Sequence, residues 1–341
     1  MIRLIMLASV MLTACQFMAP KGPPIERLQA HNIQTSSGIV QGQSEYESDA
    51  DVVSWFDIPY AQPPVGDLRW KATRALQSPR RIIVDQDEIA CVQKASRYAG
   101  ASGEGIVGAE DCLYLDIRAP ADFASQQYPV MFWIHGGGNT TGLKDYYDFT
   151  QLVARQDVVV VTVNYRLGAL GWFTHPAIQG QQEGLDKTSN FGTLDIIESL
   201  KWVQKNIASF GGDARNVTIF GESAGAHNTF ALLASPLSNG LFHKAISQSG
   251  YTTSAPLEEA FNRNNGNPLV KRGSWQIVNK ILENPQSQYS DSELRERLKQ
   301  MDAHEFIGLY HETEGYDAIP LTTIDSLVIP KEGMVVSGIA S

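Results

Sequence analysis

The stretch that decides the fold of this chain lies at positions 216–225 and reads Asn-Val-Thr-Ile-Phe-Gly-Glu-Ser-Ala-Gly. Its first half is a short apolar run that ends at a glycine, which is typical of a buried strand. Its second half, from Gly221 to Gly225, has the G-x-S-x-G pattern of a tight strand-to-helix turn, the nucleophile elbow. The serine of such a turn has strained backbone geometry, so both flanking positions must be small. The pattern also occurs by chance in glycine-containing loops, but the preceding strand favours Ser223 as a nucleophile.

Short apolar runs and helical patterns alternate around this stretch. Residues 129–134, 157–163 and 243–248 are expected to be strands, and the second of these is rich in valine, as in a strand buried on both faces. Residues 194–210 carry apolar side chains three or four positions apart, which predicts an amphipathic helix ended by Gly211. The alternation predicts an α/β fold with a central, mostly parallel sheet flanked by helices.

Beyond Gly250 the pattern becomes helical. Apolar residues at 277–282 indicate one amphipathic helix, and a second is expected from Glu293 to about Met301, after a capping cluster at 290–292. We expect these helices to cover the sheet or to cap a site. They do not form a separate domain with its own core.

A second chemical signal is His-Gly-Gly-Gly at 135–138, directly after a predicted strand. Acyl transfer creates an oxyanion that needs preorganised donors, and glycines let the backbone approach a substrate closely. Gly137, Gly138 and Ala224 would supply three N–H donors. A glycine-rich turn and a phosphate cradle are the alternatives, but no lysine–serine/threonine pair follows, unlike in a phosphate-binding loop. His135 precedes the serine in the chain and is expected to order this loop rather than to act as a base.

The N-terminus has the features of an export signal. Arg3 precedes an apolar run at 4–12 that is too short to span a bilayer. The next residues, Leu-Thr-Ala-Cys at 12–15, resemble the bacterial lipobox, in which the cysteine is lipidated. Gln16 follows this cysteine and favours the outer membrane by analogy with lipoprotein sorting. We therefore expect an exported protein, lipid-anchored in the bacterial cell envelope and facing the periplasm or the cell surface.

These features divide the chain into three parts. We expect a signal peptide at 1–14, the lipidated Cys15 with a flexible tether at 15–31, and the hydrolase-like domain at 32–341. The formal net charge of −10 becomes −11 when Arg3 is lost with the signal. Such an acidic chain is a poor candidate for binding nucleic acid or an anionic membrane surface by charge. The membrane is therefore expected as a partner only through the lipid.

Two cysteines, Cys91 and Cys112, remain once Cys15 is assigned to the lipid anchor. An exported chain meets a compartment that permits disulfides, so these two can form a bridge. Two unpaired core thiols are the alternative. No histidine lies at ligand spacing from either cysteine, so no metal site is expected.

From about Asn32 to the C-terminus the chain resembles the type-B carboxylesterase/cholinesterase family, and five ordered motifs carry the resemblance. They are Ile-Pro-Tyr-Ala-Gln-Pro-Pro-Val-Gly at 58–66, Glu-Asp-Cys-Leu-Tyr-Leu at 110–115, Asn-Tyr-Arg-Leu-Gly-Ala-Leu-Gly at 164–171, Asn-Phe-Gly-Thr-Leu-Asp at 190–195, and the run at 210–226. The resemblance implies an α/β-hydrolase fold and a carboxylic ester hydrolase with an acyl-enzyme intermediate. It also implies a small-molecule ester as substrate and neither a metal nor an organic cofactor.

The resemblance assigns roles by position. It implies Ser223 as the nucleophile and Gly137, Gly138 and Ala224 as the oxyanion hole. Glu222 either lies near the catalytic histidine, where the family often places a carboxylate, or simply fits the elbow.

The resemblance also implies a disulfide between Cys91 and Cys112. Two positions depart from the family pattern. Asp57 stands where the family usually has glycine, and we interpret it as a surface change. Asn139 stands where a bulky apolar residue is frequent, next to the acyl pocket, so it bears on substrate preference.

A serine hydrolase also needs a histidine base and an acid to orient it, which follow the serine along the chain in this fold. The histidines after Ser223 are His227, His243, His304 and His311. None has the position expected of the base. Glu314 precedes a glycine, as the family's acid often does, but it comes too early in the motif order and no histidine follows it.

We therefore interpret the sequence as an α/β-hydrolase that is truncated at its C-terminus and lacks the C-terminal strands and helices. Such a chain would expose a sheet edge, and we expect little or no esterase activity from it alone. The alternatives are a catalytically dead remnant and a non-catalytic, cholinesterase-like binding protein. Binding proteins of that kind generally lose the serine, which is present here.

Overall fold

The computed structural model describes residues 31–47, 50–77, 79–86, 88–98, 100–263, 273–311 and 322–334. The expected signal peptide, the lipidated Cys15 and its tether up to residue 30, and Glu314 lie outside these residues. Within the described ranges, no helix combines the length and the apolar character needed to cross a membrane.

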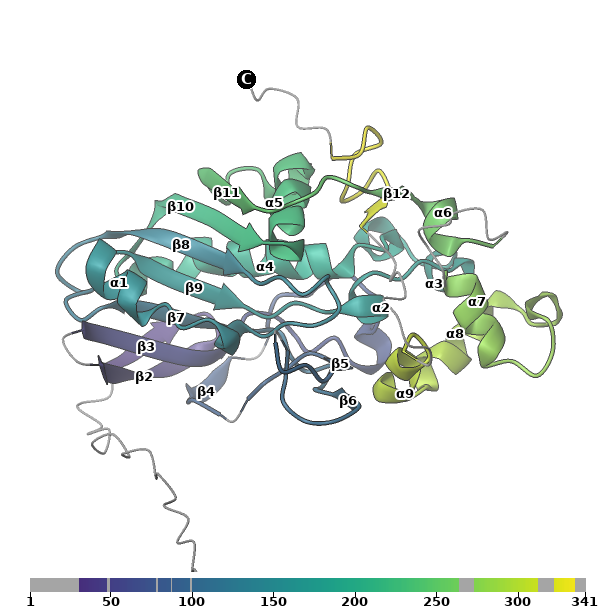
Figure 1. Cartoon of the computed structure of the whole chain (residues 1–341), viewed down its shortest axis with the longest axis horizontal. Coiled ribbons are helices and arrows are strands. Elements are labelled where there is room, and N and C mark those ends of the chain that lie inside the picture. Colours follow the sequence, from purple (N-terminus) through teal and green to yellow (C-terminus); the bar gives the residue numbers. More distant parts are fainter. Residues whose placement is uncertain are drawn as a thin grey trace, which may run out of the picture.

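A mixed sheet forms the centre of the fold (Figure 1). Its strand order is β1-β2-β3-β7-β9-β8-β10-β11, with β4 beside β2. The strands are β1 His31–Thr35, β2 Gly38–Glu47, β3 Ala50–Pro59, β4 Arg80–Ile83, β7 Tyr114–Pro120, β8 Tyr128–Ile134, β9 Val159–Val163, β10 Gly212–Glu222 and β11 Lys244–Gln248. Two small sheets lie apart from it, β5 Gln93–Lys94 with β6 Ile106–Val107 and β12 Ala255–Pro256 with β13 Thr323–Ile324.

The sheet is parallel in the half that carries the elbow, and in the other half only β4 pairs in parallel, with β2. Strands β9, β8, β10 and β11 pair in parallel, and these include the strands predicted at 129–134, 157–163 and 243–248. The pairs β1–β2, β2–β3, β3–β7 and β7–β9 are antiparallel, which the prediction of a mostly parallel sheet missed. The links from β1 to β2 and from β2 to β3 are a few residues long, and such short links permit only antiparallel pairing.

Helices cover both faces of the parallel half. Helices α4 (Phe191–Asn206) and α5 (Ala224–Ala234) pack on one face, where the Val161 side chain of β9 joins their core. Helix α1 (Thr150–Gln156) packs on the other face, where it meets Val160. Neighbouring valines of β9 therefore point to opposite layers, as the alternation of a strand requires. The predicted helix at 194–210 is confirmed as α4 with a short 3₁₀ turn, and it ends at Gly211 with φ +79°.

Short helices gather beyond the carboxyl ends of β8, β9 and β10 (Figure 1). They are α2 Gly168–Gly171, α3 Pro176–Gln179, α6 Leu257–Phe261, α7 Ser274–Lys280, α8 Asp291–Gln300 and α9 Ala303–Gly308. Short 3₁₀ turns lie at Gly66–Leu68, Lys144–Tyr146, Gly184–Lys187, Ile207–Phe210, Pro236–Ser238 and Gln286–Gln288. The predicted capping cluster is confirmed, because Ser290 and Glu293 form a capping box at the start of α8.

Asp57 is buried, so its interpretation as a surface change was wrong. Its side chain is 3% exposed, and one carboxylate oxygen lies 2.9 Å from the Lys144 ammonium. That ammonium also pairs with Asp116 at 2.9 Å and with Asp145 at 2.6 Å. Asp57 has φ +54°, a backbone region that favours glycine. An aspartate at this position therefore accepts backbone strain and gives the buried lysine a partner.

The pKa values of Lys144, Asp116 and Asp145 are shifted in this cluster. Burial alone would lower the pKa of Lys144, but the Asp116, Asp145 and Asp57 carboxylates hold it above its ordinary value. Burial raises the pKa of Asp116 well above its ordinary value, against the attraction of the ammonium. Asp145 is also affected by burial, but its hydrogen bond to Asp116 and the nearby Lys144 lower its pKa. One ammonium thus joins β3, β7 and the 3₁₀ turn at Lys144–Tyr146.

Candidate active site

Ser223 lies at the junction of β10 and α5, as the elbow pattern predicts. Its backbone has φ 56° and ψ −117°, a strained conformation for a residue other than glycine. Its N–H donates to the carbonyl oxygen of Gln248 at 2.9 Å. A Cβ on Gly225 would come within 2.0 Å of the Ile134 carbonyl oxygen, and one on Gly221 within 2.5 Å of the Gly225 carbonyl carbon. Both glycines are therefore required for the close packing of the turn against β8.

The second sequence signal folds beside the first. We use the name glycine loop for residues 135–142, which follow β8. A Cβ built on Gly136 would lie 2.8 Å from the Glu222 carbonyl oxygen and 3.4 Å from Cβ of Ser223. The glycine loop and the elbow are therefore in direct contact, although they are far apart in sequence.

The amides expected to form an oxyanion hole belong to these two segments. Gly137 and Gly138 have φ +95° and +63°, conformations that glycine adopts without strain. Ala224 is the first residue of α5, where helix N–H groups have no partner within the helix. Among the described residues, none of these three N–H groups donates a hydrogen bond to the protein. Such amides are available to an anionic oxygen.

His135 is enclosed by its own loop. Its Nδ1 lies 2.9 Å from the Gly136 carbonyl oxygen, so Nδ1 carries the proton. Its ring stacks on Tyr165 with centroids 4.4 Å apart, and the Tyr165 hydroxyl donates to the His135 carbonyl oxygen at 2.6 Å. Burial lowers the pKa of His135 to about 4, against the effect of the Gly136 hydrogen bond. A neutral, stacked histidine of this kind is suited to ordering a loop.

Asn139 and Glu222 contact different partners near the place where the glycine loop meets the elbow. Asn139 is buried with φ +57°, and its Oδ1 accepts from Nδ2 of Asn228 on α5 at 2.9 Å. Its side chain thus ties the loop to α5. Glu222 is exposed, and its carboxylate lies near Gly136. Together with burial, its charge raises the pKa of Tyr147.

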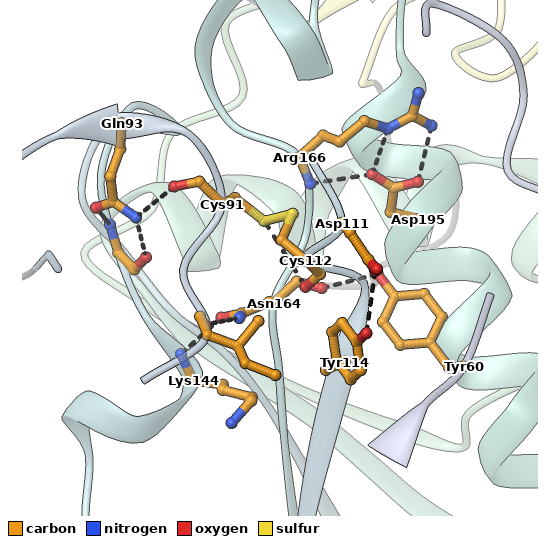
Figure 2. Close-up of a disulfide and its surroundings, with 12 residues drawn as sticks. Tyr60, Cys91, Gln93, Asp111, Cys112, Tyr114, Lys144, Asn164, Arg166 and Asp195 are labelled. Carbon is orange, nitrogen blue, oxygen red and sulfur yellow. Dashed lines mark hydrogen bonds and ion pairs between the residues drawn. A yellow bond between two sulfur atoms is a disulfide. The ribbon is translucent and has the colours of Figure 1, made fainter. Parts of the chain in front are cut away.

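The structure contains the disulfide between Cys91 and Cys112, which settles the choice between a bridge and two thiols (Figure 2). An ion pair of Arg166 with Asp195 lies nearby, and both side chains are buried. The Arg166 Nε and one terminal nitrogen each lie 2.8 Å from an Asp195 oxygen. No role was predicted for this pair from the sequence. A signal of its importance was present there, because each residue is a charged member of a family motif.

Every histidine of the chain lies within the described residues. Besides His135, five of them form the following hydrogen bonds and ring contact. His227 bonds to the Tyr251 carbonyl and the Thr322 hydroxyl, His243 to the Val217 amide, His175 to Gln286 and the Ala177 amide, and His304 to the Gly108 carbonyl, while His31 meets the ring of Phe123 edge to face. The Ser223 hydroxyl has no hydrogen-bond partner within the described residues. Burial lowers the pKa of His227 to about 4.

Neither a metal site nor the hollow described below competes with the elbow and the glycine loop as a candidate active site. Within the described ranges, no group of three histidine, cysteine or acidic side chains could hold a metal ion. A hollow of about 570 Å³ lies between α3 and α6, lined by residues that include His175, Phe261 and Asp325. Ser223 does not line it. The elbow and the glycine loop therefore remain the described region best suited to chemistry.

Comparisons with known proteins agree on one family. A model of the "Carboxylesterase family" matches residues 29–335. Carboxylesterase 1D of Rattus norvegicus is 34% identical over 343 residues, which cover 96% of this chain and 58% of the rat protein. Fumonisin B1 esterase of Sphingopyxis macrogoltabida is 43% identical over 223 residues, which cover 63% of this chain and 39% of that protein.

Solved structures give the same result. A PNB esterase superposes with a TM-score of 0.71 at 32% identity, over 88% of this chain and 58% of that chain. A carboxylesterase of Geobacillus stearothermophilus superposes with a TM-score of 0.70 at 30% identity, over 89% and 57%. The α/β-hydrolase fold is therefore confirmed. The chain spans less than two thirds of the length of these relatives.

Proposed function

The chain belongs to the carboxylesterase family, and from that premise we propose that it provides the nucleophile and oxyanion hole of a carboxylic ester hydrolase. The contact between the glycine loop and the elbow carries this proposal. Gly136 packs against Glu222 and Ser223, so the unpaired amides of the loop and of α5 lie next to the serine. Preorganised donors beside an accessible hydroxyl are what acyl transfer requires.

The proposed reaction has two halves. The Ser223 oxygen attacks the carbonyl carbon of a small-molecule ester, and the carbonyl electron pair moves onto oxygen, where the amides of Gly137, Gly138 and Ala224 stabilise it. The intermediate then collapses, and the alcohol leaves with a proton. A water molecule attacks the acyl-serine in the same way and releases the carboxylic acid.

We propose that the base and its acid do not come from the described residues. The Ser223 hydroxyl has no partner among them, and the described partners of the histidines are other groups. His227 is the histidine nearest in sequence after the serine, but both of its ring nitrogens are occupied by Tyr251 and Thr322. Without a base, acylation is slow and deacylation slower.

An ester with a good leaving group tests the nucleophile. We expect p-nitrophenyl acetate to acetylate Ser223 slowly, with little turnover beyond one equivalent, and peptide mass spectrometry would locate the acetyl group. Ser223→Ala should remove it. Ser249→Ala is a matched control, because Ser249 has a similar φ of +58°, follows the neighbouring strand β11 and is exposed, whereas Ser223 is half-buried.

Two results would contradict these proposals in different ways. The absence of an adduct at Ser223 would favour a catalytically dead remnant or a non-catalytic binding protein. Rapid multiple turnover that Ser223→Ala abolishes would support the nucleophile but refute the proposal that the base lies elsewhere.

We further propose that the chain is exported and anchored by a lipid on Cys15. The apolar run at 4–12 and the Leu-Thr-Ala-Cys motif at 12–15 support this location. In a bacterial host, radiolabelled palmitate should label the protein, and Cys15→Ser should abolish the label and release the protein from the membrane fraction. Equal labelling of Cys15→Ser would refute the anchor.

A further inference from the structure

The side chain of Gln93 connects the disulfide to the glycine loop. Gln93 is fully buried, and its Nε2 donates to the carbonyl oxygens of Cys91 and Gly142, both at 3.0 Å. Its Oε1 accepts from the N–H of Gly142 at 3.0 Å and from the N–H of Ala101 at 3.4 Å. One carboxamide therefore satisfies both the N–H and the C=O of Gly142, and every partner is a backbone group.

Gly142 is the residue on which the glycine loop closes. It has φ +138°, and a Cβ there would lie 2.0 Å from Nδ1 of His135 and 2.9 Å from the Gly136 carbonyl oxygen. The preceding residue, Thr141, donates its N–H to the Gly137 carbonyl oxygen at 3.1 Å. The end of the loop thus packs directly on its beginning. Hydrogen bonds that fix the position of Gly142 therefore also fix the segment that carries the Gly137 and Gly138 amides.

The disulfide fixes the other end of this connection. Cys112 lies two residues before β7, a strand buried along its whole length, and the bond to Cys112 ties Cys91 to that strand (Figure 2). Gln93 lies two residues after Cys91 and bonds to its carbonyl oxygen. A continuous path therefore runs from the sheet through the disulfide and Gln93 to Gly142.

We propose that Gln93 is a positioning residue for the oxyanion donors, and that the Cys91–Cys112 bond sets its place. This inference rests on the proposed function, because it needs the glycine loop to act on an oxyanion. Loss of the carboxamide leaves both the N–H and the C=O of the buried Gly142 unpaired, and the loop must then move to reach water. Displacements of about 1 Å can cost around a hundredfold in rate, so even a smaller shift is measurable.

The primary test replaces Gln93 with a side chain of similar size. In Gln93→Met we expect amide hydrogen exchange in residues 135–142 to become about tenfold faster, while exchange in α4 is unchanged. The rate of Ser223 acetylation by p-nitrophenyl acetate should fall by about tenfold. Gln286→Met is the matched control. Gln286 is also buried, and its Nε2 bonds to the Trp275 carbonyl and to Asn279, but it lies among the short helices. This control should change neither quantity.

The disulfide is tested in a double-mutant cycle. Cys91→Ala with Cys112→Ala should speed exchange in 135–142, and adding Gln93→Met should give little further effect, because both changes act on one path. Fully additive effects would refute the coupling. Wild-type exchange and acetylation in Gln93→Met would refute the positioning role.

The outcomes separate this inference from the proposed function. If the wild-type chain forms no adduct at Ser223, the proposed function fails, and faster exchange in Gln93→Met then leaves only a structural connection, which overturns the positioning role. If Gln93→Met does not fold, Gln93→Glu replaces it. That variant keeps the acceptor for the Gly142 N–H and removes the donors to the carbonyls of Cys91 and Gly142. For this variant too we expect faster exchange in residues 135–142 and slower acetylation of Ser223. Wild-type values of both would refute the positioning role.

Discussion

Strands β9 and β11 each have five residues and lie in the same parallel half of the sheet, yet their surroundings differ. Every residue of β9 is buried, because β7 and β8 pair with its two edges and helices cover both faces. Strand β11 pairs with β10 along one edge, and no described strand pairs with the other. Four of its five residues are exposed, and Ile246 is 44% exposed.

This difference divides the surroundings of Ser223. On one side, the elbow packs through Gly221 and Gly225 against β8 and the glycine loop, which belong to the buried half. On the other side, the Ser223 N–H bonds to Gln248, the last residue of the exposed strand. The side that carries the proposed oxyanion donors is thus supported by a packed core, whereas the opposite side borders solvent in the described part of the chain.

The largest expected effect comes from placing a charge in each strand. Val161→Asp buries an unpaired carboxylate in β9 and should destabilise the chain by well over 4 kcal/mol, which is enough to prevent folding. Ile246→Asp in β11 should cost less than about 1 kcal/mol, because the side chain stays in water. Urea unfolding followed by circular dichroism measures both. Equal costs would show that β11 is also buried in solution.

A smaller effect is expected from the lysine in the buried half. Lys144→Met leaves the buried carboxylates of Asp57 and Asp116, and the partly exposed one of Asp145, without their cation and should cost about 3–5 kcal/mol. Adding Asp57→Gly removes one carboxylate and the strain at φ +54°, so the double variant should recover part of this loss. Lys201→Met is the control, since Lys201 forms an exposed pair with Glu198, and should cost under about 1 kcal/mol. Chemical unfolding measures the stability of each variant. If the double variant recovers no stability, the result would argue against the pairing of Lys144 with Asp57.

The smallest expected effect is a pH dependence with one histidine on each side of the site. The pKa values of His135 and His227 are lowered to about 4, mainly by burial. As pH falls from about 6.5 toward 4, the unfolded chain takes up protons that the folded chain excludes, so the free energy of unfolding decreases. Between pH 7 and pH 5 each histidine should account for roughly 2 kcal/mol.

The two histidines can be separated by substitution. His135→Gln and His227→Gln should each reduce the pH dependence of the unfolding free energy by about one proton. Hydrogen exchange should then increase in the glycine loop for the first variant and near Tyr251 for the second. An unchanged pH dependence in both variants would contradict the buried, neutral state of these rings.

Local signals were sufficient for much of this fold. The elbow at β10 and α5, the end of the long helix at Gly211 and the capping box at Ser290 each depend on a few neighbouring residues, and all were predicted. The family motifs supplied the pairing of Cys91 with Cys112, which spacing alone left open.

Other features depend on partners far along the chain. The burial of Asp57 follows from Lys144, which no pattern near Asp57 reveals. The role of Gln93 depends on Gly142, and a glutamine in the two-residue strand β5 carries no local mark of function. Similarly, β9 and β11 were both predicted as strands, but their different burial is set by what lies on each edge and face. Side-chain type alone does not determine this.

The disulfide also bears on when the protein matures. A thiol pair made in a reducing cytoplasm stays open, and oxidation follows only after translocation. If the chain is exported as we propose, and if the Cys91–Cys112 bond orders the glycine loop through Gln93, the newly made chain would reach the envelope with an immature site. The envelope would then act as a checkpoint that delays esterase chemistry until export is complete. Protein retained in the cytoplasm should show faster exchange in residues 135–142 than protein recovered from the envelope.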